Sequence, residues 1–295
     1  MITIVLGLLA TANAATRREV FSNSAVHLSF ICGKLRSSGS GFIFFRPADP
    51  AKANEPNVSG QVFLVTNKHV LPPEGTECKI AMRVTTTLGG SPSTKTIDMP
   101  IVGADGKYLN TVRLHPDNDV AAVSITRDIY ENKIKPEFVF TNLLGTKDKL
   151  KNDAGLVGDE IYILGYPGGL FDERNAYPIW RIGIIATSPL LGYAFPDALQ
   201  KTWKLPSYVD GFLIDAHVYP GSSGSVVVVK PQAISFDSPS GILAGGPRSI
   251  TYVLGIVSSS IPVVDDKLRL VTRMGLGIVQ SADAVNATIE AFFKK

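Results

Sequence analysis

The chain has 295 residues, of which 45% are hydrophobic and 19% charged, and its formal net charge is +3. This composition predicts a packed core and excludes intrinsic disorder. Because the net charge is low and no run is rich in lysine and arginine, we expect no nucleic-acid partner. The length suits one large β domain or two ordinary domains, and the many glycines and prolines favour short strands joined by tight turns.

The first residues have the pattern of an export signal. Residues 2–10 are apolar, and Ala12-Asn13-Ala14 matches a small-residue cleavage site. The apolar run is too short to span a bilayer. We therefore expect a signal peptide over residues 1–14, a periplasmic or secreted protein, and no stable membrane anchor after cleavage. Because no basic residue precedes the apolar run, the alternative is an ordinary N-terminal strand or helix.

The next segments predict strands of a first β unit. Residues 26–31 are expected to form a strand, and residues 37–41, rich in serine and glycine, a turn into a strand over residues 42–45. Residues 46–60 are expected to form a surface loop, and residues 79–84 a half-buried strand.

Two cysteines, Cys32 and Cys78, belong to this part of the chain. In an exported protein they form either one disulfide or two buried thiols. Their spacing does not decide between these states, because a disulfide has demanding geometry.

Only four histidines occur, and His69 stands out because it lies at the end of the run 62–70, whose first residues are apolar, close to the break at Pro72 and Pro73. This arrangement predicts an imidazole at the end of a buried strand. Taken alone, the more common interpretation is a structural histidine at a strand edge.

A carboxylate follows in the segment 115–125. Asp119 ends a polar, turn-prone stretch and directly precedes an apolar strand, so it is expected at the lip of a sheet, where a carboxylate can hold a histidine tautomer. Asp117 is the competing acid, although its place after Pro116 favours a turn role. His115 is expected in the loop.

The second half of the sequence predicts another set of strands. They are expected at residues 161–165, 179–186, 212–218, 225–230, 252–258 and 268–274. Residues 190–210 form an aromatic-rich insertion, either a lid over a binding site or a packed structural loop. Ser281 is expected to cap a final helix that packs Val285, Ile289 and Phe292 on the second β unit.

Residues 220–225 read Pro-Gly-Ser-Ser-Gly-Ser between two apolar runs. Gly221 permits a sharp turn and the close approach of a substrate carbonyl. The amides of Gly221 and Ser223 would then point at the place where the oxyanion of acyl transfer forms. Alone, such a motif is more often an ordinary turn. A nucleophilic serine also needs a base and an orienting acid, which His69 and Asp119 supply.

In the order His, Asp, Ser, these segments resemble the three signatures of trypsin-like serine proteases, and most of all those of the bacterial Deg/Htr branch. The matching residues are 65–70, 118–123 and 221–225, supported by 161–169 and 253–260. The resemblance covers residues 25–280. Little sequence follows residue 280, so the PDZ domain usual in that branch is not expected.

The resemblance implies an all-β fold with two six-stranded antiparallel β-barrels, the active site in the cleft between them, and a short C-terminal α-helix. The implied divisions are an N-terminal barrel over residues 15–135, a connector over 136–158, a C-terminal barrel over 159–280 and a helix over 281–295.

The resemblance also implies roles for residues. Ser223 is the expected nucleophile, His69 the general base and Asp119 its orienting acid, with Gly221 and Ser223 forming the oxyanion hole. Ser258 is expected to bond the triad aspartate. The substrate-binding residues are expected to be His217, Ser258, Ser259 and Ser260.

Two positions qualify these implied roles. His217 falls at the base of the specificity pocket by family position, but a structural histidine on an alternating strand is the favoured alternative. Ser222 departs from the family, because an aspartate or asparagine is usual there. This departure argues against activation by a newly cleaved N-terminus.

The function implied is that of a serine endopeptidase acting on polypeptides, with no cofactor or metal. The alternatives are a catalytically silent relative that binds extended peptides in its cleft and an esterase that uses the same triad. The oligomeric state is left open.

Overall fold

The computed structural model describes residues 17–49, 51, 58–75, 77–88, 91–135, 137–151, 157–231, 251–265 and 270–294. The signal peptide expected over residues 1–14 lies outside these ranges, so its prediction stays open. Within them, no helix combines the length and apolar character needed to cross a membrane.

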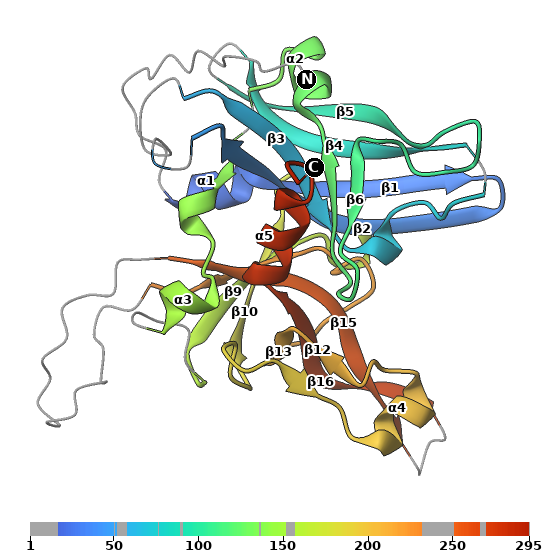
Figure 1. Ribbon diagram of the computed structural model, residues 1–295, viewed down its shortest axis with the longest axis vertical. Coiled ribbons are helices and arrows are strands. Elements are labelled where there is room, and N and C mark those ends of the chain that lie inside the picture. Colours follow the sequence, from blue (N-terminus) through green and yellow to red (C-terminus); the bar gives the residue numbers. More distant parts are fainter. Residues whose placement is uncertain are drawn as a thin grey trace, which may run out of the picture.

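The N-terminal half is an eight-stranded, mostly antiparallel sheet in the order β5-β4-β1-β2-β3-β7-β6, to which β8 adds by pairing in parallel with β2 (Figure 1). Its strands are β1 (Ala25–Cys32), β2 (Leu35–Pro47), β3 (Gly60–Thr66), β4 (Cys78–Leu88), β5 (Ser91–Val102), β6 (Val112–Leu114), β7 (Ala121–Ser124) and β8 (Val139–Phe140).

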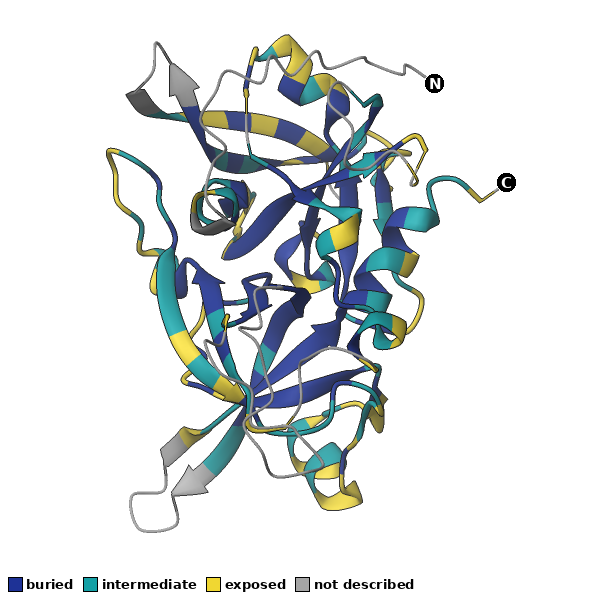
Figure 2. Cartoon of the chain, turned by 90° about the vertical axis from the view of Figure 1, so that its left-hand side faces the viewer, coloured by how far each residue is buried: buried dark blue, intermediate teal, exposed yellow. Residues whose placement is uncertain are grey.

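The C-terminal half is a closed barrel of six strands in the order β10-β13-β16-β15-β14-β9. Its strands are β9 (Glu160–Gly165), β10 (Ile179–Ile185), β13 (Gly211–Asp215), β14 (Val226–Val229), β15 (Val253–Asp265) and β16 (Leu270–Ser281). Buried residues run along these strands in Figure 2, as the apolar runs predicted.

The prediction of an all-β fold with two barrel-like units is confirmed, and the C-terminal barrel has the six strands expected. The N-terminal unit has eight strands rather than six. One of the two additional strands is β8, which comes from a segment expected to be only a connector. That segment also holds the short helix α3 (Lys147–Leu150), and α2 (Thr126–Glu131) precedes it.

Helices flank the sheets. At the N-terminal end, α1 (Arg17–Ser24) precedes β1, and at the other end α5 (Ala282–Glu290) follows β16. The Oγ of Ser281 accepts a hydrogen bond from the amide of Ala284 at 3.1 Å, which confirms the predicted N-cap. Figure 1 shows α5 at the junction of the two sheets rather than on the barrel alone.

The expected packing of α5 on the second barrel is confirmed for Val285 and Ile289, but the helix packs on the N-terminal sheet as well. Val285 and Ile289 are buried in a cluster that includes residues of β3 as well as of β14 and β15. The ring of Phe292 lies 4.9 Å from that of Phe63 on β3. The apolar face of the helix thus joins the two sheets, because both end in apolar residues at this junction.

The prediction of a turn over residues 37–41 was wrong, because these residues lie inside β2 and pair with β1. The turn falls at Gly33, whose φ is +61°. Gly39 and Gly41 are required by crowding instead. A Cβ at Gly39 would lie 2.7 Å from Cγ1 of Val70, and one at Gly41 would lie 2.8 Å from Cδ1 of Leu64.

The insertion over residues 190–210 folds as a small unit of its own. It consists of β11 (Tyr193–Ala194), α4 (Asp197–Trp203) and β12 (Tyr208–Val209), with β11 and β12 paired. Phe195 and Val209 are buried against Leu213, Ile261 and Ile278 of the barrel. This packing favours the structural alternative over the lid.

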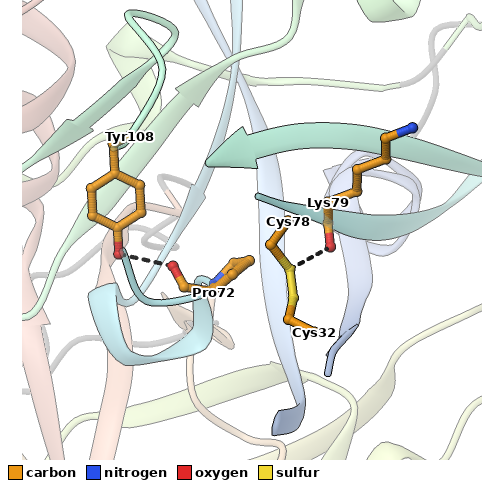
Figure 3. The surroundings of a disulfide bond; sticks show 5 residues. All are labelled: Cys32, Pro72, Cys78, Lys79 and Tyr108. Carbon is orange, nitrogen blue, oxygen red and sulfur yellow. Dashed lines mark hydrogen bonds between the residues drawn. A yellow bond between two sulfur atoms is a disulfide. The ribbon is translucent and has the colours of Figure 1, made fainter. Parts of the chain in front are cut away.

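Cys32 and Cys78 form a disulfide, with their Cα atoms 5.8 Å apart. Figure 3 shows the bond joining the end of β1 to the start of β4, beside the hydrogen bond of 3.0 Å from the Tyr108 hydroxyl to the carbonyl of Pro72. The bond therefore braces the sheet behind the loop that follows His69.

We predict that removing this disulfide lowers the free energy of unfolding by about 2–4 kcal/mol, because it frees a long loop in the unfolded chain. Thermal unfolding of Cys32→Ser beside the parent, with and without reductant, measures the change. Since Cys32→Ser and Cys78→Ser remove the same bond, the double variant should be no less stable than either single variant. Equal midpoints for oxidised and reduced parent would contradict the prediction.

Candidate active site

His69 follows the buried strand β3 and lies in the 3-10 turn Lys68–Val70 rather than at the strand end expected. Two contacts hold this turn. Val70 is buried beneath it, and the Nδ2 of Asn67 donates a hydrogen bond of 2.6 Å to the carbonyl of Asp119. The imidazole is half exposed and faces the junction of the two sheets.

Asp119 lies two residues before the strand β7 and meets His69 from the side opposite Ser223. Its Oδ2 is 2.7 Å from Nδ1 of His69, and its Oδ1 accepts from the amide of His69 at 3.4 Å. Ser258 adds a hydrogen bond of 2.7 Å from its Oγ to the same Oδ2. Burial acts to raise the pKa of Asp119, but the hydrogen bonds from His69 and Ser258 and the charge of His69 hold the pKa below its usual value.

The competing acid, Asp117, is exposed in the preceding turn. There the Nδ1 of His115 accepts hydrogen bonds from the amides of Asp117 and Asn118, at 3.2 Å and 3.0 Å. His115 therefore lies in the loop, as expected, and shapes the turn that presents Asp119.

Ser223 lies in the loop between β13 and β14. Its Oγ is 2.8 Å from Nε2 of His69 and 2.9 Å from the carbonyl oxygen of Ser258. The single hydroxyl proton thus has two acceptors within reach. When Nδ1 of His69 donates to Asp119, Nε2 is free to accept that proton, which is the arrangement needed for a general base.

In the loop around Ser223, each carbonyl group from residue 219 to 223 accepts a hydrogen bond. The donors are the amide of Ser222 for Tyr219, the amide of Gly168 for Pro220, the Oγ of Ser40 for Gly221, the amide of Ser225 for Ser222 and the amide of Ser40 for Ser223. In the part of the chain that the structure describes, nothing accepts from the amides of Gly221 and Ser223. Two unpaired amides beside a serine hydroxyl make a site for an oxyanion.

Gly221 is needed for this loop conformation. Its φ is +84°, a region that residues with a Cβ rarely adopt. A Cβ there would lie 2.6 Å from the carbonyl oxygen of Tyr166.

Ser40, on β2, is a residue that the sequence reasoning missed as part of the site. It is fully buried and bonds the loop of the opposite barrel through both its amide and its hydroxyl. The amide donates to the carbonyl of Ser223 at 2.7 Å, and the Oγ donates to the carbonyl of Gly221 at 2.8 Å and accepts from the amide of Tyr166 at 2.9 Å. Its only signal in the sequence is a serine between two glycines, which was interpreted as a turn.

The expected substrate strand lies on β15. Ser258 is held by Asp119, Ser259 is half exposed, and the Oγ of Ser260 accepts a hydrogen bond from Arg273. The strand β14 pairs with β15 only up to Ile256. Among the described residues, no strand pairs with that edge of β15 beyond Ile256.

The imidazole of His217 makes no hydrogen bond to these serines within the described ranges. The strand expected over residues 212–218 ends at Asp215, so His217 lies in the loop rather than on an alternating strand. Its imidazole is exposed and stacks on Tyr219, with ring centroids 6.2 Å apart.

A pocket of about 540 Å³ opens on the other side of His69. Its wall combines apolar side chains with the cations Arg36 and Lys68, and it also includes His69 and Asp119. The tip of the β1–β2 hairpin lines it, so the pocket belongs to the N-terminal sheet and adjoins the proposed reaction centre.

Several solved structures of proteases are similar to this chain. The inactive form of the Rv3671c protease of M. tuberculosis is 17% identical, with a TM-score of 0.46 over 93% of this chain and 91% of that one. The HtrA-type protease AlgW with a tripeptide is 16% identical, with a TM-score of 0.49 over 95% and 64%. The serine endoprotease from Yersinia pestis is 13% identical, with a TM-score of 0.45 over 94% and 66%.

A search of curated proteins found no significant match. The family model of the trypsin-like peptidase domain, however, matches residues 39–231, which is more than half of the chain and includes His69, Asp119 and Ser223. The resemblance inferred from the three sequence segments is thereby confirmed. The chain belongs to the trypsin-like peptidase family and is a trypsin-like serine protease.

Proposed function

We propose that this protein is a serine endopeptidase that cleaves polypeptides through an acyl-enzyme on Ser223. The supporting observation is a continuous line of hydrogen bonds, 2.7 Å from Asp119 to His69 and 2.8 Å from His69 to Ser223, beside two unpaired amides. In this proposal His69 is the general base and Asp119 fixes its tautomer.

The proposed reaction has two halves. The Oγ of Ser223 forms a bond to the scissile carbonyl carbon while its proton passes to Nε2 of His69, and that proton then passes to the leaving amine as the C–N bond breaks. Water, deprotonated by Nε2 of His69, next attacks the ester carbonyl; the C–Oγ bond breaks, His69 returns the proton to Oγ of Ser223, and the carboxylic acid product leaves. The amides of Gly221 and Ser223 stabilise the oxyanion in both halves, and one such donor contributes about 2.7–4 kcal/mol to the transition state.

The open edge of β15 supports a peptide as the substrate. The loop before β14 still bonds this edge of β15 at Val257, and the three residues that follow, Ser258–Ser260, begin with the one whose hydroxyl bonds Asp119. An extended peptide can pair with such an edge through main-chain hydrogen bonds, which gives affinity without demanding one sequence. We assign the acyl side of the substrate to this edge and leave His217 at its exposed rim.

Gly221→Ala tests the proposed oxyanion hole. The new Cβ meets the carbonyl of Tyr166, so the loop must move and its two amides no longer converge. We expect kcat to fall by about 10²–10³-fold, with KM nearly unchanged, because the oxyanion exists only in the transition state. The measurement is steady-state hydrolysis of a fluorogenic polypeptide and of a short ester.

Gly158→Ala is the matched control, because Gly158 also has a positive φ but a Cβ there meets nothing within 4 Å. Equal kcat for Gly221→Ala and the parent would contradict the oxyanion assignment. A parent that hydrolyses the ester but no polypeptide would be an esterase, and one that binds peptides without turnover would be a binding protein.

We also propose that the protein is exported. The disulfide between Cys32 and Cys78 supports this location, because such bonds persist in oxidising compartments and are rare in the cytosol. Fractionation of the cells that produce it, followed by thiol labelling of each fraction, tests the proposal. A cytosolic protein with two free thiols would contradict it.

A further inference from the structure

Arg181, on β10, is partly buried, and its guanidinium group has no carboxylate partner among the described residues. Its Nη1 donates to the carbonyl oxygen of His217, and its Nη2 donates to the Oγ of Ser222 at 3.2 Å. Its Nε is buried and has no hydrogen-bond partner. In the described ranges Arg181 makes no ion pair, and burial lowers its pKa.

A partly buried cation bonded only to neutral acceptors loses some of its hydration, which carbonyl and hydroxyl groups do not fully replace. The position of the two acceptors indicates what this cost achieves. Both acceptors belong to one loop, the segment of residues 216–223 that ends in the proposed nucleophile.

The two bonds reach opposite ends of this loop. His217 is at its beginning, whereas Ser222 directly precedes Ser223. Ser222 is fully buried, and its Oγ also accepts from the amide of Tyr219 at 3.3 Å. A guanidinium is a planar, rigid fork of donors, so it fixes the spacing of two acceptors better than a flexible ammonium does.

Other contacts fix the rest of the same loop. Gly168 holds the carbonyl of Pro220, and Ser40 holds those of Gly221 and Ser223. These bonds hold residues 220–223 by their carbonyl groups. Arg181 instead bonds the carbonyl of His217 and the side chain of Ser222. With Arg181 removed, that half of the loop loses its only charged donor among the described residues.

We propose that Arg181 is a positioning residue, an internal cation that holds residues 216–223 in the arrangement in which the amides of Gly221 and Ser223 converge. This inference rests on the proposed function. The protein then needs no newly cleaved N-terminus to order its nucleophile loop, because the barrel supplies the cation from its own strand. Ser222 suits this role, since its hydroxyl accepts a hydrogen bond from the guanidinium. In the family that the chain resembles, an aspartate or asparagine is usual at this position.

The test compares the rate of labelling by a fluorophosphonate probe, and kcat and KM for a fluorogenic polypeptide, among the parent, Arg181→Ala and Arg181→Lys. We expect Arg181→Ala to lower kcat and the labelling rate by about 10²-fold with KM nearly unchanged, as small displacements of catalytic groups do. Arg181→Lys should be intermediate. Millimolar guanidinium should restore part of the labelling rate of Arg181→Ala and should not accelerate the parent.

Arg113→Ala is the matched control. Arg113 is also half-buried and bonds the carbonyls of Asn110 and Val112, at 3.1 Å and 2.8 Å, but it lies on β6 of the other sheet. It should label at the parental rate even if its thermal stability falls as much as that of Arg181→Ala.

The outcomes separate the inference from the proposed function. A labelled parent whose Arg181→Ala variant labels equally fast would overturn the positioning role alone. Loss of cleavage after acidic residues only, at an unchanged labelling rate, would overturn it in favour of a substrate-binding role. A folded parent that takes no label would overturn the proposed function and, with it, a loop held ready for catalysis.

Discussion

Ser223→Ala is expected to abolish covalent labelling by a fluorophosphonate and to lower kcat by about 10⁶-fold, as loss of the nucleophile does in triads of this kind. The physical reason is the position of the Ser223 hydroxyl, 2.8 Å from Nε2 of His69. No other hydroxyl in the described chain lies within hydrogen-bond distance of that nitrogen. Intact mass spectrometry after treatment with the probe gives the result directly.

The control for this experiment is Ser207→Ala, which removes an exposed serine from the insertion between β11 and β12. It should take one adduct, as the parent should. An adduct on Ser223→Ala would place the reactive group elsewhere. A folded parent without any adduct would favour the peptide-binding alternative.

Asp119→Asn is expected to have the second-largest effect, a fall in kcat of about 10⁴-fold. An asparagine in this place can present its NH₂ group to Nδ1 of His69, so the proton moves to Nε2. That nitrogen then cannot accept the proton of Ser223. Ester hydrolysis measures the effect on the chemistry without dependence on the binding of a long peptide.

Asp117→Asn is the matched control, because Asp117 is the neighbouring acid and is exposed in the turn. It should hydrolyse the ester at the parental rate. If Asp117→Asn were the inactive variant instead, the assignment of the acid would be wrong.

The lowered pKa of Asp119 gives the same variant a signature in stability. A carboxyl group whose pKa is lower in the folded than in the unfolded state stabilises the fold fully above its unfolded pKa, which is about 3.9. This contribution is lost as the pH falls through the folded pKa. The free energy of unfolding of the parent should therefore approach that of Asp119→Asn in acid, as urea titrations at neutral and low pH would show.

Local patterns predicted much of the fold and the site. Apolar runs located the strands next to His69, Asp119 and Ser223, because a buried strand needs such a run wherever it pairs. The N-cap at Ser281 was also predicted, since capping depends on residues three positions apart.

The remaining features depend on contacts between distant parts of the chain. Ser40 and Gly221 are separated by 181 residues, so no local pattern reveals their hydrogen bond. Gly39 and Gly41 suggested a turn, because the sequence does not distinguish a glycine required by close packing from a glycine required by a turn. Arg181 read as one polar residue of a strand, and only the closed barrel brings it to Ser222.

The hydrogen bonds of Ser40 bear on when the site is assembled during synthesis of the chain. In the proposed mechanism, the base His69, the acid Asp119 and their neighbour Ser40 all precede residue 120, whereas the nucleophile Ser223 and the amides beside it follow residue 220. A ribosome-bound chain holding only the first group has neither nucleophile nor oxyanion donors, and the second group lacks its backbone support until β2 docks against it. The proposed mechanism therefore implies that peptide hydrolysis begins only when both sheets have formed and joined, so that a growing chain cannot cleave itself or its neighbours before that moment.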